Sequence, residues 1–401
     1  MAGWEVKPLG EVCAIARGGS PRPIQAFLTD AVDGIPWIKI SDATASGKYI
    51  YSTAEKIKPA GAARSRLVTD GDFLLSNSMS FGRPYIMRTT GCIHDGWLVL
   101  SKYEDAFNQD FLYHLLGSPQ VFAQFDRLAA GSTVRNLNID LASRVAVPIP
   151  PASEQRRIVA ILDDAFEGIA TAKANAEKNS QNAREWAARK LATALGAAST
   201  NGRVDMLEKL VAPSCTLSYG IVQPGDEVSD GLLVVRPVDL GDKTVYADGL
   251  KRIDPALARS YARTTLEGND LLLCVRGTTG TVAMADFALA GANVTRGIVP
   301  IRFEPQTISQ AFGYYLLRSE PVQAQIRAKT YGTALMQINI GDLRKIVVAF
   351  PPLEKQTALV EQLDAIQEAA NQLTDVYERK RAALDELKRS LLHQAFSGAL
   401  A

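Results

Sequence analysis

The sequence predicts an α+β protein made of two duplicated globular domains, separated by two long helices that pair as an antiparallel coiled coil. Three observations support this prediction. The second half of the 401-residue chain repeats the first at an offset of 201 residues, each copy begins with short strand-like runs, and each copy ends in a heptad pattern. We therefore expect globular domains over residues 1–152 and 200–353, and long helices over residues 153–199 and 354–401.

The repeat is clearest at the end of each globular segment. Between Gly131 and Asp163, ten of the 33 positions are identical to those found 201 residues later, without a gap. Helical solenoid repeats have periods of about 20–50 residues, so a period of about 200 indicates a duplicated domain. A chain built from two copies of one domain is suited to a target that itself has two parts.

The first globular segment alternates short apolar runs with Gly and Pro. One helix is expected over residues 111–125, and an edge strand over 144–150, where Pro150 and Pro151 end it. The other expected strands cover residues 35–40, 72–76, 85–88 and 97–100. The second segment repeats these cores, but its loops differ almost completely. A shared scaffold with divergent loops is typical of two recognition domains that have different targets.

Each long helix has few helix breakers and two apolar columns at heptad spacing. In the first helix the columns are Ile158, Ala165, Ala172, Asn179, Trp186 and Leu162, Ile169, Ala176, Ala183. In the second they are Leu359, Ile366, Leu373, Lys380, Leu387 and Leu363, Ala370, Tyr377, Leu384, Leu391. Asn179 and Lys380 are polar exceptions, which either fix the register of a buried seam or are exposed at a partner contact. A spacing of three and four residues sustained over about five heptads predicts a coiled-coil seam. Two such stripes in one chain can cover each other.

Composition sets limits on the function classes. The chain has 44 basic and 43 acidic residues, so its net charge of +1 gives no sign of a nucleic-acid protein. The four cysteines, Cys13, Cys92, Cys215 and Cys274, form no Cys-x-x-Cys pair, which favours reduced thiols over a zinc site. No apolar run approaches the ~20 residues of a membrane span, and the first residues contain no apolar signal region. These features predict a cytoplasmic chain that does not contact a membrane.

Several features together resemble one known family. Both copies contain a Gly-[Ser/Thr]-x-x-x-x-[Leu/Ile]-Asn-Ile loop, which ends at Ile139 and Ile340, then Pro-Pro-x-x-x-Gln, then a heptad helix. With the duplication and the opening residues 4–12, Trp-Glu-Val-Lys-Pro-Leu-Gly-Glu-Val, this pattern resembles the specificity (S) subunits of type I restriction–modification systems. The second copy departs from the usual pattern at Lys355, which stands where the family commonly has Glu.

The resemblance implies a concrete function. Such a subunit carries two target-recognition domains, each of which reads one half of a bipartite sequence in double-stranded DNA. The helices set the gap between the half-sites and dock two methyltransferase (M) subunits for adenine methylation, and restriction (R) subunits join to cleave unmodified DNA. The subunit is not catalytic and holds no cofactor. S-adenosylmethionine is bound by the M subunits, and ATP and Mg by the R subunits.

Base reading requires hydrogen-bonding side chains at base edges, on a frame held to the phosphates. The divergent loops supply suitable residue types. In the first domain these are Arg17, Ser20, Arg22, Lys39, Ser78, Ser80, Arg83, Arg135 and Asn136, and in the second Tyr219, Arg236, Arg276, Thr278, Thr279, Arg296 and Gln337.

Structural roles remain open for many loop residues. Gly18, Gly19 and Gly277 fit tight turns equally well. Arg83, Arg276 and Arg296 fit ordinary solvated charges best, and phosphate anchors that carry no sequence information are the second alternative. Trp37 fits a core position better than a base-stacking platform, and Asn138 and Asn339 fit a structural turn better than base reading.

Three other classes of function remain to be weighed. Catalysis is disfavoured, because the three histidines are isolated and Gly277-Thr-Thr-Gly280 lacks the Gly-Lys-[Ser/Thr] of a phosphate-binding loop. A self-sufficient bipartite DNA-binding regulator would bind its operator without a methyltransferase. A coiled-coil scaffold for proteins would show no sequence preference on DNA.

Overall fold

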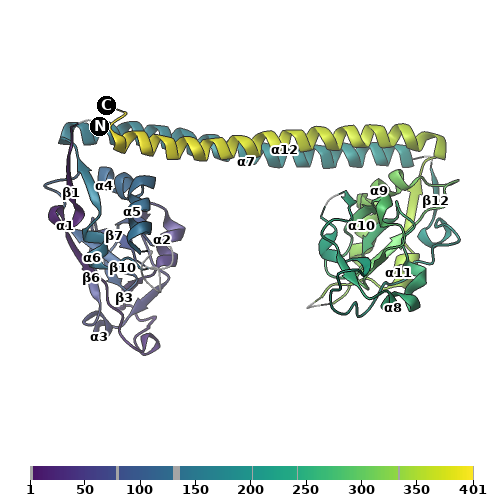
Figure 1. The fold of residues 1–401 in the computed structure, drawn as a ribbon, viewed down its shortest axis with the longest axis horizontal. Helices are drawn as coiled ribbons and strands as arrows, with labels where there is room; N and C mark the ends of the chain where they lie inside the picture. Colours follow the sequence, from purple (N-terminus) through teal and green to yellow (C-terminus); the bar gives the residue numbers. More distant parts are fainter. Residues whose placement is uncertain are drawn as a thin grey trace. The chain divides into compact units, whose positions relative to one another are not determined.

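The computed structural model describes residues 3–77, 81–129, 136–200, 202–241, 243–332 and 335–400. The chain divides into two compact units: unit 1 comprises Met1–Glu177 with Glu378–Ala401, and unit 2 comprises Lys178–Tyr377. Each unit holds one globular domain and a segment of both long helices (Figure 1). The mixed α/β domains and the long helices confirm the predicted fold class.

The globular part of unit 1 contains a five-stranded sheet in the order β2-β10-β7-β8-β4 and a four-stranded sheet in the order β5-β3-β9-β6. The pairs β3–β9 and β4–β8 are parallel and the others antiparallel, and a separate antiparallel pair joins β1 to β11. The strands are β1 Glu5–Pro8, β2 Ala14–Arg17, β3 Ile35–Ile38, β4 Tyr49–Ile50, β5 Glu55–Ile57, β6 Arg66–Val68, β7 Phe73–Ser76, β8 Pro84–Met87, β9 Gly91–Ile93, β10 Trp97–Ser101 and β11 Ala146–Ile149.

Short helices complete unit 1. They are α1 Leu9–Val12, η1 Ile24–Ala26, α2 Ile40–Ser46, α3 Pro59–Ala62, α4 Gln109–Leu116, α5 Pro119–Ala129 and α6 Ile139–Ser143. Phe111 of α4 and Phe125 of α5 are fully buried in one core with Phe73 of the five-stranded sheet. The single helix expected over residues 111–125 is therefore wrong. Pro119 has no backbone N–H to continue a helix, so α4 ends before it and α5 begins at it.

Unit 2 repeats this arrangement, with one strand fewer in each of the two larger sheets. Its strand orders are β14-β17-β16-β19, β15-β13-β18 and β12-β20. The strands are β12 Arg203–Met206, β13 Leu232–Val235, β14 Thr244–Val245, β15 Lys251–Ile253, β16 Leu271–Cys274, β17 Val282–Ala285, β18 Asn293–Val294, β19 Ile298–Ile301 and β20 Val347–Phe350. The helices are η2 Leu207–Lys209, η3 Pro237–Asp239, α8 Pro255–Ala258, η4 Arg259–Thr264, η5 Phe287–Leu289, α9 Gln310–Arg318, α10 Glu320–Lys329 and α11 Ile340–Arg344.

The long helices are α7, Ala152–Ser199, and α12, Leu353–Ser397. Within unit 1 they run in opposite directions, because Lys173 pairs with Asp385 at 2.5 Å and Glu177, one turn later, pairs with Arg381, one turn earlier. In the part of the chain that the structure describes, no helix combines the length and apolar character of a membrane span.

The buried stripe of these helices departs from the predicted heptad columns. On α7, Leu162, Ile169, Ala176 and Ala183 are buried as expected, but Trp186 is 42% exposed and Asn179 is also exposed. Their places are taken by the next residues, Ser180 and Ala187. On α12, Leu373 and Leu387 are likewise exposed. An α-helix drifts by about 20° per heptad relative to a strict 3.5-residue repeat, so the buried stripe moves by one residue along helices that supercoil weakly.

The identities between the two copies mark structural joints. Gln155 is buried at the start of α7, accepts a hydrogen bond from the Asn108 N–H (2.7 Å), and donates to the carbonyl oxygens of Ala106 (2.8 Å) and Pro150 (2.9 Å). Gln356 makes the same three bonds at the start of α12, to Ser309, Thr307 and Pro351. Each glutamine therefore fixes a globular domain to its long helix.

Asn138 and Asn339 are helix caps. Each accepts a hydrogen bond of 2.8 Å from a backbone N–H in the first turn of the following helix, α6 or α11. This geometry confirms the structural role expected for both residues.

Candidate nucleic-acid interface

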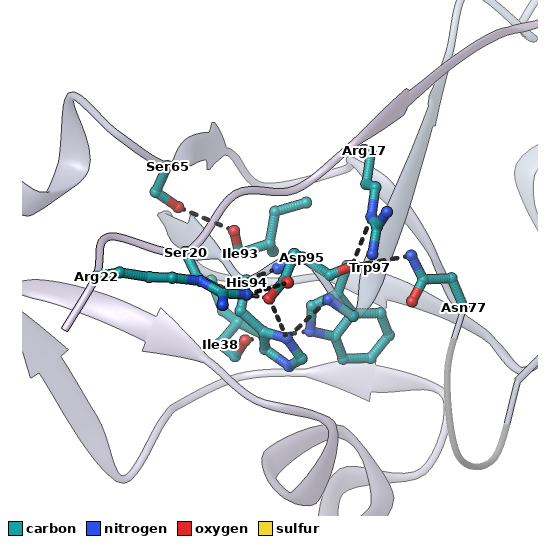
Figure 2. A network of polar contacts seen from close by, with 11 residues as sticks. Arg17, Ser20, Arg22, Ile38, Ser65, Asn77, Ile93, His94, Asp95 and Trp97 are labelled. Atoms are coloured by element: carbon teal, nitrogen blue, oxygen red, sulfur yellow. Dashed lines mark hydrogen bonds and ion pairs between the residues drawn. The ribbon is translucent and has the colours of Figure 1, made fainter. Parts of the chain in front are cut away.

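In unit 1 the loop between β9 and β10 gathers several polar side chains around Asp95 (Figure 2). The Ser20 hydroxyl donates to Asp95 Oδ1 at 2.5 Å, and the Arg22 guanidinium lies 3.3 Å from Oδ2. The pKa of Asp95 is lowered, mainly by the hydrogen bond from Ser20. The group is therefore an ionised carboxylate at neutral pH and can only accept hydrogen bonds.

The main chain of this loop is fixed from two sides. Arg17 Nε and Asn77 Nδ2 both donate to the Asp95 carbonyl oxygen, at 2.8 and 3.0 Å (Figure 2). A Cβ atom on Gly18 would come within 2.1 Å of the His94 carbonyl oxygen, so only glycine permits this approach. The same constraint applies in unit 2, where a Cβ on Gly220 would lie 2.0 Å from the Val294 carbonyl oxygen.

The rings of Trp97 and His94 are each held by a hydrogen bond to the main chain. Trp97 is fully buried and donates its indole N–H to the Ile38 carbonyl oxygen at 3.1 Å. His94 Nδ1 accepts from the Gly96 N–H at 2.8 Å, and burial lowers the pKa of His94, which favours the neutral ring.

Lys39 pairs with Glu55 at 2.6 Å beside an open depression of about 1270 Å³. Trp37 lines this depression but is only 3% exposed, so it serves the core as expected.

In unit 2 the loop after β16 and the segment before α11 are joined by backbone hydrogen bonds. Arg276 and Gln337 form an isolated β-bridge, and the Gly277 N–H donates to the Met336 carbonyl oxygen at 2.8 Å. The Thr279 hydroxyl donates to the same oxygen at 3.2 Å. The residues after β16 and those before α11 thus form one surface.

Two arginines of this region differ in their freedom. Arg236 is held by Asp239 through two hydrogen bonds, from Nε at 3.1 Å and from Nη2 at 2.8 Å. Arg296 is exposed, and its backbone N–H donates to the Ile221 carbonyl oxygen at 2.8 Å. No ion pair engages its side chain within the described residues.

The structure brings some of the predicted residues together and leaves others apart. Arg17, Ser20 and Arg22 meet around Asp95, and Asn136 is linked to this region because Leu137 donates its N–H to the Asn77 carbonyl oxygen at 2.8 Å. Three further predicted positions have separate surroundings. Arg83 is exposed in the turn between β7 and β8, Tyr219 donates its hydroxyl to the Ile338 carbonyl oxygen at 3.3 Å, and the Thr278 carbonyl oxygen accepts from Thr281 at 2.9 Å. Ser78, Ser80 and Arg135 lie outside the described residues.

Sequence reasoning missed His94 and Asp95. The internal repeat contained the signal, because the 201-residue offset places these residues opposite Thr295 and Arg296, and Arg296 was predicted as a contact.

Comparison with known proteins agrees with the duplicated architecture. Residues 1–179 and 258–380 match the family model described as type I restriction modification DNA specificity domain. The specificity subunit of the type I restriction enzyme EcoBI from Escherichia coli is 24% identical over 392 residues, which cover 92% of this chain and 80% of that protein.

Solved structures share the fold. A chain from a structural study of complex assembly and conformational transition of the type I R-M system superposes with a TM-score of 0.78 at 21% identity, over 99% of this chain and 98% of that one. The HsdS subunit from Thermoanaerobacter tengcongensis gives a TM-score of 0.59 at 20% identity, over 99% and 97% of the two chains.

Proposed function

Since the chain belongs to the family of type I restriction–modification DNA specificity subunits, and is a DNA-recognition subunit, we propose that each of its units reads one half of a bipartite DNA target. One observation supports this division most strongly. The two units keep the same joints, at Gln155 and Gln356, but place different side chains on the corresponding loops, as Asp95 and Arg296 illustrate. One frame with two different surfaces suits two different half-sites.

Members of this family work in complexes with DNA and with M and R subunits. We propose that this chain docks two M subunits through its long helices, and that R subunits join the complex. In this arrangement the chain has no catalytic role. The M subunits would hold S-adenosylmethionine, and the R subunits ATP and Mg. A stand-alone regulator or a protein scaffold is not favoured, because the similar proteins are restriction-enzyme subunits.

Adenine methylome sequencing tests the proposal. The full chain is co-expressed with its methyltransferase in a host that lacks adenine methylation, and the methylated motif is determined. We expect one motif with two specific parts and an unread gap. A contiguous motif, or methylation that is unchanged without this chain, would contradict the proposal.

A deletion variant tests whether the helices set the gap. Eleven residues correspond to about three helical turns, so removing 11 residues from both helices at paired levels keeps their buried faces aligned. Lys173 and Asp385 mark one such level. The deletion shortens the helices by roughly 16 Å, and we expect the gap to shrink by about five base pairs at ~3.4 Å each. A changed half-site with an unchanged gap would reject the spacer role.

A further inference from the structure

The register of the sheets makes the two recognition loops directly comparable. In unit 1, β3 and β9 are parallel with Ile38 opposite Ile93, and in unit 2, β13 and β18 are parallel with Val235 opposite Val294. The second residue after each of these β-pairs is Asp95 in unit 1 and Arg296 in unit 2. The same place in the frame therefore holds a hydrogen-bond acceptor in one unit and a donor in the other.

We infer that these two positions decide whether a unit contacts a base through a hydrogen-bond acceptor or through a donor. Asp95 accepts a hydrogen bond from the exocyclic amino group of a cytosine or adenine in one half-site, and Arg296 donates to the O6 and N7 acceptors of a guanine in the other. The inference rests on the proposed function, because it assigns the loops to the DNA-facing surface.

The surroundings of Asp95 fit an acceptor site. Its side chain is 40% exposed. Ser20 lies 2.5 Å and Arg22 3.3 Å from its oxygens, and His94 Nδ1 lies 3.9 Å from Oδ1, which leaves lone pairs available for a further donor. Arg22 is 81% exposed, so its cation offsets the repulsion between this carboxylate and DNA phosphates without enclosing the carboxylate. The fixed backbone, with Arg17 and Asn77 on the Asp95 carbonyl oxygen, holds the side chain in place before DNA binds.

Arg296 is the freer of the two arginines that follow the parallel pair of β13 and β18. Both Arg236 and Arg296 follow the parallel pair of β13 and β18, but two nitrogens of Arg236 are already used by Asp239. Arg296 has its backbone anchored on Ile221 and pairs with no acid among the described residues. A guanidinium with free parallel N–H groups matches the two acceptors of guanine.

Base analogues test the inference on the complete complex with M subunits. The half-sites found by methylome sequencing are made as duplexes in which one cytosine is replaced by 2-pyrimidinone, or one adenine by purine, so that only the amino group is lost. We expect one such replacement to weaken wild-type binding about tenfold, and we expect Asp95→Ala to bind the unmodified duplex about tenfold more weakly. The variant should be indifferent to that replacement. The cytosine and adenine arms show which base is read.

The second half-site is tested in the same way, with 7-deazaguanine in place of guanine and with Arg296→Gln. Asp33→Ala removes another exposed carboxylate of unit 1 and serves as the matched control, with binding expected to remain unchanged. Thermal unfolding of each variant confirms that it folds. The inference is overturned if Asp95→Ala weakens binding to all duplexes equally and stays sensitive to every analogue. Wild-type complex without preference for a bipartite duplex would instead reject the proposed function.

Discussion

Unit 1 and unit 2 agree at their joints and differ at their loops. Gln155 and Gln356 make three corresponding hydrogen bonds, whereas Asp95 and Arg296 occupy one position with opposite charge. Residues that connect a domain to its helix must satisfy the same buried backbone groups in both copies, so their identity is restricted. Asp95 and Arg296 make no such shared contact, so the residue at this position can differ between the copies. In this protein, identity between the copies therefore indicates assembly, and divergence indicates recognition.

At a third kind of position, both units keep a lysine over a tyrosine ring, but the acidic residue that pairs with the lysine differs. Lys48 of unit 1 lies over a tyrosine ring of α4 and pairs with Asp110 at 2.8 Å. Lys243, its counterpart before β14, lies over tyrosine rings of α9 and pairs with Asp364 of α12 at 2.5 Å. The lysine is retained, but its acid comes from the globular domain in unit 1 and from the long helix in unit 2.

The largest expected effect comes from Trp97→Ala. Trp97 is fully buried, its ring centroid lies 5.6 Å from that of Tyr85, and Ile298 stands in its place in unit 2. The variant leaves a cavity and removes the indole donor of the Ile38 carbonyl oxygen, so we expect unit 1 to lose about 3–5 kcal/mol of stability. Native-state hydrogen exchange reports each unit separately. Ile298→Ala leaves a smaller cavity, so it should lower the stability of unit 2 by less than Trp97→Ala lowers that of unit 1. If Trp97→Ala reduced the protection of both units equally, the predicted difference between the units would be wrong.

The next effect concerns the joints. Gln155→Leu and Gln356→Leu keep the side-chain volume but leave one N–H and two carbonyl oxygens without their partner. An unsatisfied buried group costs about 1–3 kcal/mol, and we expect a loss in this range from each variant. Calorimetry of both should give similar losses. A large loss in one unit and none in the other would show that the two joints are not equivalent.

These joints also show what could be predicted from the sequence. The repeat located Gln155, Gln356 and the capping asparagines, because such residues are fixed by local backbone geometry that recurs in both copies. The seam at Trp186 was predicted wrongly, since a heptad count cannot reveal how strongly the helices supercoil. Asp95 was missed because its partners Ser20 and Arg22 are more than 70 residues away, and only the fold brings them together.

Capping gives a smaller and more uniform effect. Asn138→Ala and Asn339→Ala each remove one side-chain acceptor from the first turn of a short helix. A lost N-cap costs about 1 kcal/mol, and we expect this value in both units by denaturant unfolding. Asn138→Asp keeps the acceptor and should restore most of the stability. At position 339 the side-chain amide also donates to Asp342 Oδ2 at 2.5 Å, so the rescue variant there is Asn339→Ser, which keeps an acceptor without adding a second carboxylate. A difference in half-site preference would instead assign these residues a role in recognition.

The smallest expected effect is a pH dependence of stability that His114 gives to unit 1 and that unit 2 lacks at the equivalent position. Its Nε2 lies 2.7 Å from Asp163 Oδ1, and in unit 2 the equivalent pair is Tyr315 and Asp364. Burial lowers the pKa of His114 below its ordinary value of 6.5, against the opposing effect of Asp163, whereas burial raises the pKa of Tyr315. At position 114 the folded chain therefore binds fewer protons than the unfolded chain below about pH 6.5, so the contribution of His114 to stability falls as the pH drops from 6.5 through the lowered pKa.

His114→Tyr gives unit 1 the arrangement of unit 2 and should remove this share of the acid sensitivity. Tyrosine stays neutral at these pH values, so the variant takes up no proton at this position when it unfolds. His94, whose pKa burial also lowers, should leave a remaining slope. Hydrogen exchange at pH 5 and pH 7.5 measures the loss of protection in each unit. Equal acid sensitivity of unit 1 in wild type and variant would show that His114 does not distinguish the units.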